Sequence, residues 1–168
     1  MKKFFIGMLV AVLVLSTFFM AGTAAAKDSE IMEFSSMVGV PRPYTGATNA
    51  IRGVPGGGRP WAISAAEGEL KANGKLEVEV RGLVIDPNEP VATAGTNPSP
   101  TFRVIVSCMS TDATGAAVVS NVMTEPFPAD AAGNAEVETK LTLPSPCIAP
   151  IIFVTSATGS WFALLEIN

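Results

Sequence analysis

The chain has 168 residues, of which 48% are hydrophobic and 15% are charged, which argues against a disordered chain or one that wraps nucleic acid. It contains no histidine, so Ser-His-Asp and Cys-His catalytic arrangements, the usual zinc sites and haem held by histidine are excluded. Fifteen glycines and thirteen prolines with only 7% aromatic residues favour short β-strands joined by turns.

The first 26 residues have the pattern of a secretory signal peptide. Lys2 and Lys3 precede an uncharged run over residues 4–26, and this run ends in small residues before Lys27. The alternative is an uncleaved membrane anchor over residues 4–26, because an apolar run of this length can cross a bilayer. We expect cleavage, since the alanine-rich end is typical of a cleavage site, and therefore a secreted or extracytoplasmic protein.

Residues 27–168 are expected to form one domain with a net charge of −6, from nine basic and fifteen acidic residues. This charge predicts no nucleic-acid partner, and a membrane contact only through residues 4–26 if they are retained. Residues 27–60 are expected to hold one strand, over 34–40, and then a Gly/Pro-rich connection. Its glycine-rich end at 52–59 lacks the spacing of a phosphate-binding loop, so a close-packed turn is favoured over an anion cradle.

The main sandwich is expected over residues 61–168, and its clearest hairpin joins strands at 61–71 and 75–85. Apolar and charged residues alternate along the second strand, which is typical of a half-buried strand. A two-residue Asn-Gly turn would mix the two faces of this hairpin. A three-residue loop with Gly74 in the left-handed region pairs Leu70 with Leu76 and keeps one face apolar, so we adopt this register.

Later strands are predicted from alternation, or from apolar runs bounded by turn residues. They span residues 101–109, 116–127, 135–143, 148–155 and 161–167. With about eight strands and no helix after the signal segment, the sequence predicts an all-β fold, an antiparallel β-sandwich of immunoglobulin-like architecture.

Cys108 and Cys147 are the only cysteines. An even number of cysteines in an exported chain predicts a disulfide, which we expect to tether the two sheets. The alternative is a pair of buried free thiols.

Several short motifs in the first half carry a family resemblance. They are Phe34 with Gly39-Val40-Pro41, then Gly68-Glu69-Leu70, and then the run from Gly74 to Leu83. In this order they resemble the opening half of CHRD-type domains, which are β-rich extracellular modules. The whole chain expected after cleavage, residues 27–168, also resembles secreted bacterial β-sandwich proteins of unknown function. Neither resemblance implies a catalytic residue.

The adopted hairpin register gathers carboxylates on its outer face. Opposed like charges on a sheet cost about 0.2–1 kcal/mol per pair, so a compensating group is expected. We favour compensation of these carboxylates by solvent and by cationic side chains. The candidate cations are Lys71, Lys75 and Arg81 at the ends of the hairpin, or Lys140 or Arg103 from a neighbouring strand. The alternatives are a weak Ca²⁺ site or a glycosidase-type carboxylate pair, and the second would need a closed cleft. The possible cation patch consists of Glu67, Glu69, Glu77 and Glu79.

The two tryptophans, Trp61 and Trp161, lie in alternating segments and are expected in the core. A cleft that exposed either of them, or Tyr44, beside a carboxylate would instead favour sugar binding.

No catalytic residue, metal site or cofactor is predicted, apart from the possible weak Ca²⁺. The leading hypothesis is an exported, non-catalytic β-sandwich that acts at the cell envelope by surface contact. Its expected partner is a protein or glycan at the cell surface. The first alternative is a carbohydrate- or Ca²⁺-binding module, and the second is a carboxylate-based hydrolase.

Overall fold

The fold was determined as a computed structural model, which describes residues 29–165. The predicted signal peptide, its helix and its cleavage site lie outside the described residues. Between residues 29 and 165 the chain forms twelve strands and no helix. Hence no helix in this part of the chain is long and apolar enough to cross a membrane.

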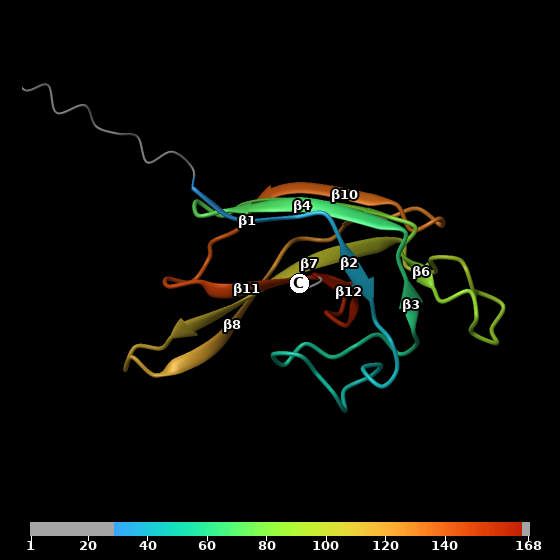
Figure 1. Ribbon diagram of the computed structural model, residues 1–168, viewed down its shortest axis with the longest axis horizontal. Helices are drawn as coiled ribbons and strands as arrows, with labels where there is room; N and C mark the ends of the chain where they lie inside the picture. The colour runs from blue at the N-terminus through green and yellow to red at the C-terminus, as the bar shows by residue number, and fades with distance from the viewer. Residues whose placement is uncertain (1–28, 166–168) are drawn as a thin grey trace, which may run out of the picture.

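Two antiparallel sheets form the body of the protein, one above the other in Figure 1. The four-stranded sheet, here called sheet A, runs in the order β1 (Glu30–Phe34), β4 (Ala65–Lys71), β5 (Lys75–Arg81), β10 (Ala135–Lys140). The second, sheet B, runs in the order β2 (Met37–Gly39), β12 (Trp161–Leu165), β11 (Ile148–Thr155), β7 (Thr101–Thr111), β8 (Ala117–Met123), and β9 (Phe127–Pro128) also pairs with β7. A separate ribbon pairs β3 (Trp61–Ala62) with β6 (Val84–Ile85).

The core lies between the two sheets. Alternate residues of β4 and β5, among them Leu70, Leu76 and Val78, are buried against residues of β7 such as Phe102, Val104 and Val106. Each sheet has one apolar face, and the apolar face of sheet A packs against that of sheet B. This packing removes both apolar surfaces from water. The predicted all-β sandwich is therefore confirmed.

Three of the predicted strands are in fact broken where the chain changes sheets. The strand expected over 34–40 is divided at Ser35 and Ser36 into β1 of sheet A and β2 of sheet B. The strands expected over 61–71 and 75–85 likewise each give one strand of sheet A and one of the β3–β6 ribbon. Apolar and polar residues keep alternating where the chain passes from one sheet to the other, because both sheets face the same core. The sequence pattern therefore did not reveal where the chain changes sheets.

The strand expected over 116–127 is also divided, into β8 and β9, and the strand expected over 135–143 ends at Lys140. Leu141 and Leu143 pack against the core from the connection that follows. Their apolar side chains were counted as strand because a buried connection and a strand give similar patterns.

The three-residue hairpin loop is confirmed. Gly74 has φ of 87°, its amide donates to the Lys71 carbonyl at 2.9 Å, and Leu70 pairs with Leu76. A Cβ on Gly74 would also overlap the Leu141 carbonyl oxygen. Both the positive φ and the close approach therefore require glycine at this position.

The glycine-rich connection covers part of the outer face of sheet B. The Trp161 amide donates to the Pro55 carbonyl at 2.8 Å, and the Gly57 amide donates to the Trp161 carbonyl at 2.7 Å. The Gly56 amide donates to Gly46, and a Cβ on Gly56 would collide with the Tyr44 carbonyl. These amides are bonded within the protein, so the segment packs closely at Gly56 and Gly57, as the favoured close-packed turn would.

Cys108 and Cys147 form the predicted disulfide, but it does not tether the two sheets as expected. Cys108 is on β7, and Cys147 immediately precedes β11, which is the neighbour of β7 in sheet B. The bridge instead fixes the end of the segment that carries the chain from β10 in sheet A to β11 in sheet B. A stable disulfide is typical of an oxidising, extracytoplasmic compartment.

Candidate functional site

The outer face of sheet A carries a row of glutamates that crosses all four strands. In the ladder, Glu33 of β1 lies opposite Glu69 of β4, Glu69 opposite Glu77 of β5, and Glu77 opposite Glu138 of β10. Facing residues in an antiparallel ladder point to the same side of the sheet. The four carboxylates therefore share one surface.

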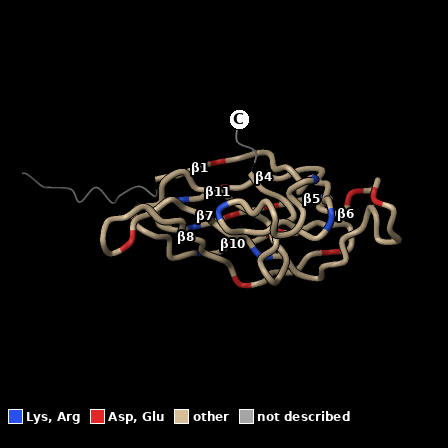
Figure 2. The backbone as a smooth tube through the Cα atoms, turned by 90° about the horizontal axis from the view of Figure 1, so that it is seen from below, with Lys and Arg blue, Asp and Glu red and all other residues tan. Residues whose placement is uncertain are grey.

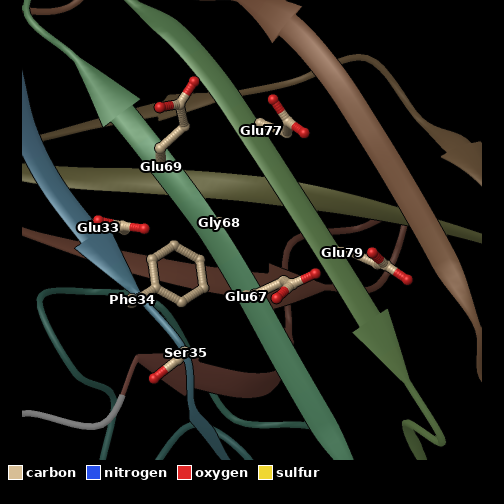
Figure 3. A pocket seen from close by; sticks show the side chains of 8 residues that line it. All are labelled: Glu33, Phe34, Ser35, Glu67, Gly68, Glu69, Glu77 and Glu79. Carbon is tan, nitrogen blue, oxygen red and sulfur yellow. The ribbon is translucent and has the colours of Figure 1, made fainter.

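A second row runs parallel to the first. Glu67 of β4 lies opposite Glu79 of β5, which lies opposite Glu136 of β10. The sequence-predicted patch of Glu67, Glu69, Glu77 and Glu79 thus lies on one face and forms the centre of a larger surface, seen in part in Figure 3. Figure 2 shows acidic residues in red along the chain, one stretch of them beside β1. We call the outer face of sheet A with these two rows the acidic face.

Sequence reasoning missed Glu33, Glu136 and Glu138 as members of this surface. The alternation of glutamate with apolar residues along β10 was visible, and it indicated a face exposed to solvent. It carried no information about which strand would pair with β5, so the three residues could not be assigned to the same surface.

Lys75 at the end of the hairpin compensates part of the first row. Its Nζ lies 3.0 Å from Glu138 Oε1 and 3.8 Å from oxygens of both Glu69 and Glu77. The hydrogen bond and charge of Glu138 raise the pKa of the Lys75 ammonium above its ordinary value, and the charges of Glu77 and Glu69 contribute further. Lys71 Nζ adds a contact of 2.9 Å to Glu69.

The second row is less well compensated. Arg81 pairs with Glu79, but Glu67 and Glu136 make no salt bridge within residues 29–165, and neither does Glu33 at the β1 end of the first row. Of the neighbouring cations that the sequence offered, Lys140 lies opposite Lys75 without a salt bridge in this part of the chain, and Arg103 lies on β7 in the other sheet. The hairpin's own cations therefore carry the compensation, and the middle of the face stays negative.

A depression of about 630 Å³ lies in the acidic face between β1, β4 and β5 (Figure 3). Gly68 forms part of it, and a Cβ there would collide with the Phe34 ring and the Glu77 carbonyl oxygen. Glu33 and Glu67 lie at its sides (Figure 3). The hollow is open to solvent, whereas a glycosidase pair needs a cleft that excludes water from one carboxyl group.

The described residues include no three His, Cys, Asp or Glu side chains placed to hold one metal ion. The glutamates that line the depression are spread along the two cross-strand rows and are not gathered closely enough to hold one ion, and Ca²⁺ requires six to eight oxygen ligands. The face can attract cations by its charge, but within residues 29–165 it provides no coordination shell.

The tryptophans are in the core, as predicted. Trp161 is 1% exposed and Trp61 is 7% exposed. Trp61 stacks on Phe162 with the ring centroids 3.8 Å apart. Neither indole is available as a platform for a sugar ring, although Tyr44 is exposed.

No protein-family model matches this chain, and no curated protein or solved structure matches it. The resemblance to CHRD-type domains therefore stays a prediction.

We expect Glu77→Gln to leave the melting temperature unchanged or to raise it slightly at low ionic strength. Glu77 lies between Glu69 and Glu138, and its Lys75 contact is a long one of 3.8 Å, so repulsion outweighs attraction. Thermal unfolding at low and high salt measures the effect, which should shrink as salt is added.

Glu125→Gln is the matched control, because it removes the same charge at an exposed position outside sheet A. Millimolar Ca²⁺ should leave the melting temperature of both proteins unchanged. A stability loss of several kcal/mol in Glu77→Gln, or a saturable Ca²⁺-dependent rise that this variant lacks, would contradict this account of the face.

Proposed function

We propose that this chain is an exported, non-catalytic β-sandwich protein that acts by surface contact, and that the acidic face is its contact surface for a cationic partner at the cell envelope. The observation that carries the proposal is the pair of glutamate rows, of which Glu33, Glu67 and Glu136 lack salt bridges in the described chain. Like charges in a sheet cost stability, and a cationic partner would relieve that cost on binding.

The position of these residues supports binding over catalysis. The carboxylates lie on regular strands, where the backbone ladder holds them in fixed rows, and the hollow between them is open to solvent. A regular, rigid charged surface loses little conformational entropy on binding. The disulfide supports export, since such bonds persist in oxidising compartments.

An oligolysine peptide tests the acidic face directly. We expect saturable binding at low ionic strength that weakens as salt rises, because the attraction is between exposed charges. The double variant Glu33→Gln/Glu67→Gln should bind about tenfold more weakly, from about 0.2–1 kcal/mol for each lost pair.

The control Glu125→Gln removes one charge at an exposed position outside sheet A that makes no salt bridge in the described chain, and it is compared with the single variants Glu33→Gln and Glu67→Gln. Equal weakening in the control and in these single variants would mean that only net charge matters and would overturn the assignment to this face. Turnover in a broad hydrolase screen that one Glu or Asp substitution abolishes would overturn the non-catalytic part of the proposal.

A further inference from the structure

The edge of sheet B at β8 is regular and uncharged. β8 pairs with β7 from Ala117 opposite Thr111 to Met123 opposite Ile105, with no bulge in the ladder. Its sequence, AVVSNVM, contains neither a charged residue nor a proline. In Figure 1 this strand lies at the periphery of the lower sheet, and within the described chain its only strand neighbour is β7.

The other edges of the two sheets carry features that prevent further pairing. β1 has a bulge after Glu30, β10 has charged side chains at Glu136, Glu138 and Lys140, and β2 has only three residues. Bulges, charges and short length are the usual protections of an edge strand. Among the described edges of sheets A and B, β8 alone has none of them.

Half of the backbone groups of β8 point away from the sheet. The Thr124 amide donates to the Val104 carbonyl at 2.9 Å, so even-numbered residues of this segment form the hydrogen-bonded pairs with β7. The odd-numbered residues, Ala117, Val119, Asn121 and Met123, therefore direct their N–H and C=O groups outward. No other backbone hydrogen bond in residues 29–165 uses these groups.

The side chains beside this edge form an exposed apolar strip on the outer face of sheet B. Ile148 lies opposite Met109, and Met109 lies opposite Val119, so the strip crosses β11, β7 and β8. Ile148 is 59% exposed and Val119 is 43% exposed. The glycine-rich connection reaches this edge at Asn121, whose Nδ2 donates to the Arg52 carbonyl at 3.0 Å.

We propose that β8 pairs with β8 of a second copy of this chain, antiparallel about a two-fold axis at Ser120, and forms a symmetric dimer with a continuous sheet. This register places Ala117 opposite Met123 of the partner subunit and Val119 opposite Asn121 of the partner subunit. The outward groups of all four odd-numbered residues are then satisfied in reciprocal pairs.

Two features of this edge suit a second copy. Because β8 contains no charged residue, a two-fold axis at Ser120 brings no like charges together. Each copy also presents a strand already ordered by β7, so pairing costs little backbone entropy. The contact is one strand wide, which predicts a weak dimer with a dissociation constant in the micromolar range.

Sedimentation equilibrium of the mature protein tests the dimer. We expect a reversible monomer–dimer equilibrium for the wild type and a shift to monomer for Val119→Lys, with an unchanged melting temperature for the monomer. Val38→Lys is the matched control, because Val38 is also 43% exposed and lies on β2, the opposite edge of sheet B. It should dimerise as the wild type does.

Ser120→Cys tests the register, because the two-fold axis brings this residue opposite its copy at a distance that a disulfide can bridge. Ser120 also lies opposite Cys108 of the native disulfide, so the cross-linked cysteines are identified by mass spectrometry of a non-reduced digest, which separates a 120–120 bridge from exchange with Cys108. We expect an intermolecular cross-link under mild oxidation, and a weaker one for Val119→Cys. A wild type that remains monomeric at hundreds of micromolar, equal dissociation by Val38→Lys, or preferential cross-linking of Val119→Cys would overturn the proposal.

Discussion

Replacing Trp161 by alanine is expected to lower the free energy of unfolding by about 3–5 kcal/mol, as large-to-small core substitutions do. Trp161 is 1% exposed, packs against Phe153 with the ring centroids 6.2 Å apart, and lies beneath the glycine-rich connection. The substitution leaves a cavity between this connection and sheet B. Urea unfolding monitored by far-ultraviolet circular dichroism measures the loss.

Trp161→Phe is the informative control for this substitution. The Trp161 Nε1 has no hydrogen-bond partner among the described residues, so phenylalanine removes packing area without breaking a bond. We therefore expect it to lose less than half of the stability that alanine loses. Proteolysis at residues 52–59 should also rise in the alanine variant, since the connection loses its support. A loss below about 1 kcal/mol in Trp161→Ala would contradict the buried position.

Removing the disulfide with the double variant Cys108→Ala/Cys147→Ala is expected to cost about 4 kcal/mol, the value that loop-closure entropy gives for a loop of this length. The two cysteines are 39 residues apart in sequence, and the loop between them includes β8, β9 and β10. Without the bridge, the unfolded chain regains that freedom. Equilibrium unfolding in urea under non-reducing conditions measures the difference.

A reductant separates loss of the bridge from side effects of the substitutions. Wild type in reductant should be destabilised to about the same extent as the double variant, and the variant itself should not respond to reductant. If two thiols titrate in the denatured, unreduced wild type, the disulfide is absent and the prediction fails.

The sequence by itself determined the class of fold and the register of the hairpin formed by β4 and β5. Alternation along residues 75–81 defined which residues face the core, and Gly74 allowed the three-residue loop that keeps Leu70 and Leu76 on one side. These features were readable because side-chain alternation and turn geometry depend on neighbours in the chain. The pairing of the two cysteines was readable for a different reason, since the chain contains only two.

The tertiary structure decided which strands are neighbours. The sequence contains Glu33 and Glu138 as unrelated residues, and only the order β1-β4-β5-β10 places them in one row with Glu69 and Glu77. The crossing at Ser35 and Ser36 and the disulfide between neighbouring strands of sheet B were likewise decided by topology. Strand order results from contacts between residues far apart in the chain, and alternation, which is a local property, does not encode it.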